Sequence, residues 1–381
     1  MDTDESGRLL INLVFDPSSS LRRGDQILEL NGRPIESLMR MFVGEMSGES
    51  QVYRAASGAP MFGNLLLIHS IHAPFTIRVA GAGGADRRVE SAGIPRDQLR
   101  QRVAAALGGT RTPNFAYRTI EPGIGYMNLR SLAGDLSRFQ NDVAAVFRQV
   151  AVDKDRALII DLRNNGGGDS RLGDELLRYF AAKPYRQSGR KDWKMSAEHR
   201  AYLRSFLRPP LRSLHTESML PQGRKYFSGP DGTIVSEEEK LHTPARAEPF
   251  FSSAAYVLTG PRTFSSAVDL ADAMKTYRLA TLIGAETGGR PNTFGEGYPF
   301  RLPRSVLAGQ VSSARYVRAS GDVPDRAAWC PTSRSLRLPP ICAFRAMWCW
   351  KRPAPCRRVP NLQVLLVRAG IGAAAVGARS Q

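Results

Sequence analysis

The middle of this chain alternates short apolar runs with longer stretches of helical periodicity. The run 157–160 consists of four apolar residues and ends at Asp161, which is typical of a strand buried on both faces of a sheet. Residues 124–129 and 256–258 predict two more strands, and residues 137–150 predict a helix. The apolar face of that helix comprises Phe139, Val143, Val146, Phe147 and Val150. Strands that alternate with helices indicate an α/β domain with a mainly parallel sheet.

Two segments follow these strands and carry the residue types that acyl-transfer chemistry needs. Asp161-Leu-Arg-Asn-Asn-Gly-Gly-Gly168 predicts a loop whose glycines let the backbone approach a ligand closely. In Thr263-Phe-Ser-Ser-Ala-Val-Asp269 a helical spacing of apolar residues begins, so Ser265 and Ser266 lie at a strand-to-helix turn. A serine there presents its hydroxyl beside free backbone N–H groups, which are the nucleophile and the oxyanion donors of an acyl-transfer site.

Each segment also has an ordinary structural interpretation. A run of asparagine and glycine is commonly only a tight connection between two elements. A serine at a helix start is commonly an N-cap that accepts a hydrogen bond from a free amide of the first turn. The catalytic interpretation therefore depends on the two segments occurring together and in this order.

The two segments resemble the tail-specific, or C-terminal-processing, serine peptidases, a family that includes tricorn protease and the retinoid-binding repeats. Family members end a strand in Asp-Leu-Arg-x-Asn-x-Gly-Gly and carry the nucleophile in Thr-x-Ser-Ala-Ser/Ala-Glu at a helix start. The matching residues here are Asp161, Leu162, Arg163, Asn165, Gly167, Gly168, Thr263, Ser265 and Ser266. The strand 280–284 and the loop 286–291 are also similar to the family. The resemblance implies a ClpP/crotonase-like β-β-α superhelix for the catalytic domain.

The resemblance also implies how the serines act. Ser265 aligns with the nucleophile, and the backbone N–H groups of Ser266 and Gly167 are expected to bind the oxyanion. If Ser266 rather than Ser265 faced the cleft, these roles would shift by one residue.

Four further residues are assigned by the same pattern. We expect Arg290, Asn165 and Gly168 to contact the substrate. Glu286 could orient the general base. It lies one place later than the family's glutamate, whose position is occupied by Ala285 in this chain. An exposed loop carboxylate is the alternative interpretation of Glu286.

The general base is where this chain departs from the family. One branch uses a lysine twenty-five residues after the nucleophile, and Arg290 stands at that position here. A guanidinium stays protonated in proteins, so Arg290 cannot accept the serine proton. Another branch takes a histidine from an Asp-Gly-His-Thr segment, which does not occur before Leu21. The histidines of the chain, each of which fits a surface or core position as well as a base, are His69, His72, His199, His215 and His242.

Residues 1–80 predict a smaller unit ahead of the catalytic domain. The segment 21–35 reads as a strand between Gly24 and the hairpin turn Asn31-Gly32. It resembles the Gly-Asp-x-Ile-x-x-Val-Asn-Gly segment of PDZ domains, which bind peptide C-termini by adding a strand to a sheet. An ordinary hairpin is the alternative. Because little chain precedes Gly24, we expect a partial, truncated PDZ-like region.

Composition predicts the remaining boundaries. Residues 81–113 are polar and rich in glycine and alanine, which predicts a linker to a catalytic domain at 114–326. Within that domain, residues 185–250 are rich in arginine, proline and serine, so we expect an irregular insertion that covers the site.

Residues 327–381 differ from the rest of the chain. They hold all four cysteines, three of the four tryptophans and nine basic residues, with no acidic residue. If the third base of each codon for Met347-Trp-Cys-Trp-Lys351 is read with the first two bases of the next codon, the genetic code allows only Val-Val-Leu-Glu. The same change of reading frame at 327–335 is compatible with Gly-Val-Val-Pro-Asp, a segment that resembles the end of the family's catalytic domain. We therefore hypothesise that the reading frame slips near Arg326 and that the tail is disordered. Its cysteine spacing matches no zinc pattern.

Half of the formal positive charge that would favour nucleic-acid binding lies in the tail 327–381. The formal net charge of +18 falls to +9 over residues 1–326, which removes most of the support for nucleic-acid binding. A basic binding module, if present, would lose affinity steeply from low to physiological salt. The acidic start Met1-Asp-Thr-Asp-Glu5 predicts no secretory signal, and no apolar run reaches the length of a spanning helix. The family resemblance nevertheless suggests an exported or periplasmic parent.

These patterns predict a serine peptidase that cuts protein or peptide substrates near their C-termini through an acyl-enzyme on Ser265. We expect no metal or nucleotide cofactor, no nucleic-acid partner and no membrane span. The alternative is a catalytically silent, peptide-binding relative, because the sequence shows no general base.

Overall fold

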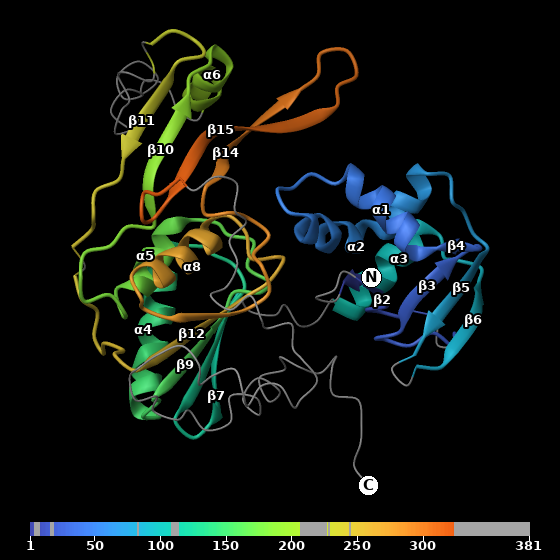
Figure 1. Ribbon diagram of the computed structural model, residues 1–381, viewed down its shortest axis with the longest axis horizontal. Helices are drawn as coiled ribbons and strands as arrows, with labels where there is room; N and C mark the ends of the chain where they lie inside the picture. The colour runs from blue at the N-terminus through green and yellow to red at the C-terminus, as the bar shows by residue number, and fades with distance from the viewer. Residues whose placement is uncertain are drawn as a thin grey trace.

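The computed structural model describes residues 1–3, 8–15, 19–81, 84–107, 114–205, 227, 229–243 and 245–323. Three sheets organise these residues: one in the N-terminal part, one at the centre of the catalytic part and one formed by later strands (Figure 1). The predicted tail 327–381, the segment 206–226 and His215 lie outside the described residues.

The N-terminal part is an antiparallel sheet with two helices packed on it (Figure 1). The strands and helices are β1 (Asp2–Thr3), β2 (Leu9–Leu10), β3 (Gln26–Leu30), β4 (Arg33–Pro34), α1 (Ile35–Glu45), α2 (Gln51–Ile68), β5 (Phe75–Ala80) and β6 (Asp86–Ser91). The predicted turn joins β3 to β4, because Asn31 and Gly32 adopt positive φ values of 51° and 73°. Phe42 from α1 and Phe62 from α2 meet edge to face in the core. The PDZ-like interpretation of residues 1–80 stays a prediction.

The predicted linker 81–113 was wrong over most of its described length. It contains β6, which pairs with β5, and helix α3 (Arg96–Leu107). Only Val89 among the residues of β6 is buried, so the apolar alternation that marks a strand is missing from this segment.

The central sheet of the catalytic part confirms the predicted parallel arrangement. Its strands lie in the order β13-β12-β9-β8-β7, and β8, β9, β12 and β13 run parallel, while β7 is antiparallel to β8. The elements are β7 (Phe115–Glu121), β8 (Ile124–Leu129), α4 (Leu136–Val152), β9 (Ala157–Asp161), α5 (Ser170–Leu177), β12 (Ala254–Thr259), α8 (Ser266–Thr276) and β13 (Thr281–Gly284). This mixed α/β architecture brings the ends of β9 and β12 to one edge, because the two strands are parallel neighbours.

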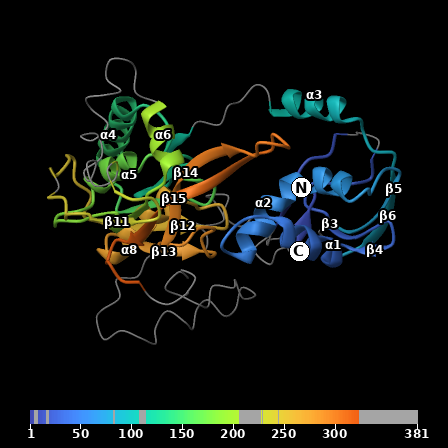
Figure 2. The same cartoon turned by 90° about the horizontal axis from the view of Figure 1, so that it is seen from above.

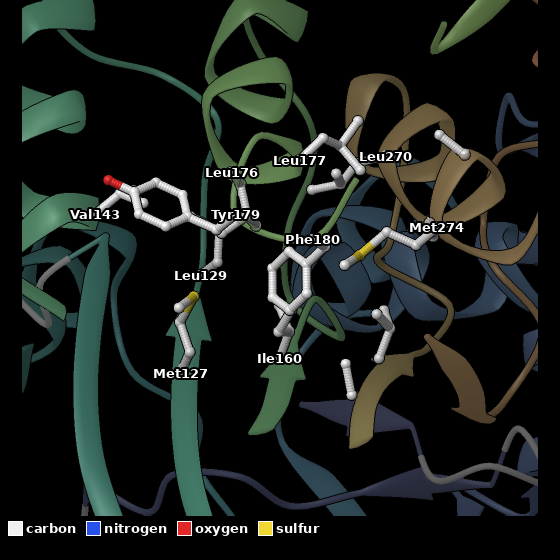
Figure 3. Close-up of a cluster of buried hydrophobic side chains, with 14 of the residues drawn as sticks. Met127, Leu129, Val143, Ile160, Leu176, Leu177, Tyr179, Phe180, Leu270 and Met274 are labelled. Carbon is white, nitrogen blue, oxygen red and sulfur yellow. The ribbon is translucent and has the colours of Figure 1, made fainter. Parts of the chain in front are cut away.

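The main core lies between this sheet and helices α4, α5 and α8 (Figure 3). All five residues of β9 are buried, and α4 buries Phe139, Val143, Phe147 and Val150 as its periodicity predicts. In Figure 3, Leu270 and Met274 of α8 approach the same cluster as Ile160 of β9. Helix α8 is therefore held on the sheet by apolar packing. Among the described helices, none combines the length and apolar character that crossing a bilayer requires.

The predicted irregular insertion 185–250 contains regular elements in the part that the structure describes. It contributes β10 (Ser188–Lys194), α6 (Ala197–Ser205) and β11 (Ile234–Glu238), which join β14 (Thr293–Arg301) and β15 (Ala308–Arg318) in an antiparallel sheet of order β11-β10-β15-β14. This sheet forms the upper part of the molecule in Figure 1. The prediction failed because β10 reads Ser-Gly-Arg-Lys-Asp-Trp-Lys and holds its place through ladder hydrogen bonds and ion pairs rather than through an apolar run.

Candidate active site

The two predicted segments meet at one edge of the central sheet. Thr263 is fully buried; its Oγ1 donates a hydrogen bond to the Leu162 carbonyl at 2.7 Å and accepts one from the Gly260 amide at 3.0 Å. The Phe264 amide donates to the Asn165 carbonyl at 3.0 Å. The turn after β12 is thus joined to the glycine loop after β9.

Ser265 is exposed at this junction, immediately before α8. Its backbone adopts φ 52° and ψ −135°, a conformation that non-glycine residues adopt only when the surrounding structure imposes it. Its Oγ caps no amide of the helix and makes no hydrogen bond to any residue that the structure describes. The ordinary N-cap interpretation of Ser265 is therefore wrong, and its hydroxyl is available for chemistry.

Ser266 has the opposite environment. Its side chain is 5% exposed, and its Oγ donates to the Gly168 carbonyl at 2.5 Å and accepts from the Gly168 amide at 3.1 Å. Of the two serines, Ser265 faces solvent and Ser266 faces the glycine loop. The Ser266 amide belongs to the first turn of α8, where backbone N–H groups have no acceptor within the helix.

Gly167 packs directly against Ser265. It is buried with φ 94°, and a Cβ at this position would lie 2.7 Å from Ser265 Cβ and 2.8 Å from the Phe264 carbonyl oxygen. Its amide, predicted as an oxyanion donor, donates instead to Asn165 Oδ1 at 2.9 Å. The Gly167 amide can reach a substrate oxygen only after it releases that side chain.

Asn165 and Gly168 are held by the protein itself. Asn165 is 0% exposed, and its Nδ2 donates to the Leu129 carbonyl at 2.9 Å, so the expectation that its side chain contacts substrate is not met in this structure. Its role is to hold the loop against β8. Gly168 is exposed, but a Cβ there would lie 2.2 Å from the Leu132 carbonyl oxygen, so only glycine fits.

A comparison with protein families identifies this arrangement. The model of peptidase family S41 matches residues 123–323, which include both segments and strands β8, β9, β12 and β13 of the central sheet. The chain belongs to peptidase family S41. The predicted family is thereby confirmed, and the chain is a serine-type peptidase by membership.

Solved structures support the same fold. A serine-to-alanine mutant of CPAF superimposes with a TM-score of 0.59 at 16% identity, covering 86% of this chain and 76% of that chain. Mature CPAF complexed with lactacystin gives a TM-score of 0.55 at 15% identity, covering 86% of this chain and 76% of that chain. At these identities the likeness concerns the fold. The comparison with curated proteins finds no match.

The loop after β13 completes the site of this S41 chain. The amides of Gly288 and Gly289 donate to the Thr263 carbonyl at 2.9 and 3.4 Å, and a Cβ on Gly289 would lie 3.4 Å from the Ser265 nitrogen. Burial raises the pKa of Glu286, and the neighbouring Arg290 opposes that shift. Arg290 Nε is buried and makes no hydrogen bond to the described residues. The predicted substrate cation therefore lies on the loop that adjoins the reactive turn.

The S41 motif residues Asp161 and Arg163 stabilise the end of β9. Arg163 binds the Asp161 carboxylate with two of its nitrogens, and the Tyr126 hydroxyl donates to Asp161 Oδ2 at 2.6 Å. Burial alone would raise the pKa of Asp161, but Arg163 and Tyr126 outweigh it and hold the pKa below its usual range. These residues stabilise the strand end from which the glycine loop begins.

None of the described histidines is hydrogen-bonded to Ser265. His69 Nε2 lies 2.8 Å from Glu45, and the His242 backbone pairs with that of Tyr185. His72 is exposed on the loop after α2. His199 is buried beside two tyrosine rings, and burial lowers its pKa. That one of these histidines serves as the general base stays a prediction, and the contacts that they make do not favour it.

Sequence reasoning missed two residues next to the site. Tyr53, from the N-terminal part, stacks on Phe264 with ring centroids 4.7 Å apart, and a contact between such distant segments leaves no local pattern. Asp269 follows Ser265 by one helical turn, and burial, reinforced by Asp272, raises its pKa to about 8. Its position four residues after Ser265, on the same side of α8 as Asp272, could have indicated a carboxyl group near the site.

Proposed function

We propose that this chain hydrolyses peptide bonds near the C-termini of protein or peptide substrates through an acyl-enzyme on Ser265. The observation that carries the proposal is the Ser265 hydroxyl itself. It is exposed, makes no hydrogen bond to the described residues and sits at a constrained positive φ between Gly167 and the start of α8. A serine peptidase needs a nucleophile held in that manner beside backbone amides.

The chemistry proceeds in two halves. Ser265 Oγ attacks the scissile carbonyl carbon, its proton passes to a base, and the carbonyl oxygen becomes an oxyanion. The amide of Ser266 points from the helix start and binds that oxyanion, and the Gly167 amide adds a second donor once it leaves Asn165 Oδ1. The protonated amine leaves as the C–N bond breaks, and water then hydrolyses the ester and restores Ser265.

The base that accepts the Ser265 proton is not among the side chains that contact Ser265 in the described part of the chain. Arg290 stays protonated and cannot serve. General-base assistance contributes about 10²–10⁴ in rate, so this chain alone is expected to cleave peptides slowly or not measurably. We propose that a histidine encoded upstream of Met1 provides the base.

We assign substrate recognition to Arg290 and Gly168. The guanidinium of Arg290 has a buried Nε without a hydrogen-bond partner in the described part of the chain, and a carboxylate is its preferred ligand. A free substrate C-terminus supplies that carboxylate. Gly168 is exposed and lies beside Ser266, where a substrate chain can lie, and Glu286 keeps the role of a carboxylate that orients the base.

The test compares the chain as it stands, a version extended by the upstream codons with the frame restored after Arg326, and that extended version with Ser265→Ala. Peptides with a free C-terminal carboxylate are compared with the same peptides amidated. The proposal expects Ser265-dependent turnover by the extended version, with preference for the free carboxylate. Robust Ser265-dependent turnover by the unextended chain would contradict the missing-base part and return the role to one of its own histidines.

A catalytically silent, peptide-binding relative is the second candidate, and the arginine at position 290 favours it. In that case the extended chain cleaves none of the peptides but binds those with a free carboxylate, and Arg290→Gln weakens the binding. A titration of fluorescent peptide against the extended chain and its Arg290→Gln variant measures this binding, and only the absence of Ser265-dependent cleavage of the bound peptide distinguishes the silent relative from the peptidase.

A further inference from the structure

The first turn of α2 touches the residue that precedes the reactive serine. Tyr53 and Phe264 stack with ring centroids 4.7 Å apart and planes 18° apart. Figures 1 and 2 both place α2 beside the loops of the catalytic part. Because Phe264 and Ser265 are consecutive, a displacement of the Phe264 ring changes the backbone conformation of Ser265.

The Tyr53 ring is enclosed by backbone on two further sides. A Cβ on Gly48 would lie 2.4 Å from Tyr53 Cδ1, and a Cβ on Gly288 would lie 2.5 Å from Tyr53 Cδ2. Gly288 belongs to the loop that bonds the Thr263 carbonyl. The ring thus contacts the turn after β12 through Phe264 and the loop after β13 through Gly288, and the absence of side chains at Gly48 and Gly288 is what lets it fit.

The backbone position of Tyr53 is also fixed. Ser50 caps α2, since its Oγ accepts a hydrogen bond from the Tyr53 amide at 3.1 Å. The preceding Glu49 accepts a hydrogen bond from Thr293 Oγ1 at 3.0 Å, which ties the same segment to the catalytic part a second time. A well-anchored helix end therefore presents the ring to Phe264.

Ser265 needs such support. A non-glycine residue at φ 52° relaxes to an ordinary conformation unless its neighbours prevent it. Gly167 and the Asn165 carbonyl restrain the turn from the side of β9. On the other side, the Phe264 ring is confined between Gly289 and Tyr53.

We propose that Tyr53 is a positioning residue, which holds Ser265 in its reactive backbone conformation through Phe264 and so makes the nucleophile depend on the docked N-terminal part. The structural half of this proposal is independent of the proposed peptidase function. Only its consequence for catalysis rests on that function.

The test uses a thiol at position 265 as a probe that needs no base. In Ser265→Cys, the alkylation rate with iodoacetamide is followed against pH, and the peptide that carries position 265 is quantified by mass so that the tail cysteines do not interfere. A thiol at a helix N-terminus titrates below the usual value near 8.5. We expect Tyr53→Ala to raise the apparent thiol pKa by about one unit, which lowers the thiolate fraction about tenfold on the acidic side.

Two matched variants control for folding and for docking. Tyr53→Phe keeps the ring, and the Tyr53 hydroxyl makes no hydrogen bond to the described residues, so the pH profile should stay that of the parent. Thr293→Val removes one hydrogen bond to the same segment but leaves the Tyr53–Phe264 stack in place, so its shift of the thiol pKa should be clearly smaller than that of Tyr53→Ala. A Tyr53→Ala profile identical to the parent, or an equal shift in Thr293→Val, overturns the proposal.

A second measurement separates this proposal from the proposed function. The rate of fluorophosphonate labelling at Ser265 is compared in Tyr53 variants of the upstream-extended chain, where a displaced nucleophile is expected to cost about 10²-fold in Tyr53→Ala and nothing in Tyr53→Phe. If the thiol profile shifts but no variant labels at Ser265, Tyr53 positions the residue and the peptidase function fails. If labelling is equal in all variants, the positioning role fails.

Discussion

Ser266 and Gly168 bind each other twice, with the serine hydroxyl donating to the glycine carbonyl at 2.5 Å and accepting from the glycine amide at 3.1 Å. This pair joins the start of α8 to the end of the glycine loop, and it leaves Ser265 as the serine that faces solvent. The two adjacent serines thus have separate tasks, one structural and one chemical.

Substituting each serine by alanine separates these tasks. Ser266→Ala leaves the Gly168 amide and carbonyl without their partner and is expected to lower the free energy of unfolding by about 1–2 kcal/mol. Ser265→Ala removes an exposed hydroxyl with no partner in the described part of the chain, so the change should stay within about 0.5 kcal/mol. Urea unfolding of the two variants checks this, and the reverse order would mean that the roles are exchanged.

Neighbouring glycines offer a matched test of the loop. Gly167→Ala introduces a Cβ that would lie 2.7 Å from Ser265 Cβ at a backbone with φ 94°, so the turn must shift. In the upstream-extended chain, a displacement of that size is expected to lower the rate of fluorophosphonate labelling at Ser265 by about 10²-fold. Gly166→Ala meets nothing within 4 Å and is the control, with an unchanged rate. Equal effects of the two substitutions would show that packing of Gly167 on Ser265 is unimportant.

Asp269 gives the unfolding free energy a specific pH dependence. Burial raises its pKa to about 8, above the value of 3.8 for a free carboxyl, so the folded protein keeps a proton that the unfolded chain releases between these values. Stability is therefore lost as the pH rises through this window. Asp269→Asn removes the titrating group. The advantage of the variant over the parent, measured as the difference in the free energy of unfolding, should therefore grow as the pH rises, by up to about 1.4 kcal/mol per pH unit.

Chemical unfolding at about pH 5 and about pH 8 measures that advantage, because both values lie near or inside the window. Asp142→Asn, a substitution on the exposed face of α4, is the control and should give a difference that does not change with pH. A constant difference between Asp269→Asn and the parent would mean that the carboxyl is ionised in the folded protein.

The parts of the fold that could be predicted are those where burial leaves a local pattern. β9 is apolar because both of its faces are covered, and α4 repeats apolar residues because one face meets the core. β10 could not be predicted in the same way, because Lys191 and Arg190 hold their ion pairs on a sheet whose burial is incomplete. The strand there follows from pairing partners distant in sequence.

The residues of the site likewise fall into those that the sequence indicated and those that only the folded structure shows. The residue types of the two segments indicated Ser265 and Gly167, but the φ of Ser265 decides which of the two serines is exposed, and no composition reveals it. The engagement of the Gly167 amide by Asn165 and the stack of Tyr53 on Phe264 depend on the folded geometry. Sequence therefore predicted the chemistry better than the contacts that position it.

The most direct test of the central claim is the mapping of a fluorophosphonate adduct on the upstream-extended chain with its frame restored. The reagent reacts with a serine that has a base and an oxyanion pocket, so we expect one modified peptide, which contains Ser265, and no adduct in Ser265→Ala. An adduct on Ser266 or on any other serine, or no adduct at all in the extended chain, would contradict the assignment of Ser265 as the nucleophile.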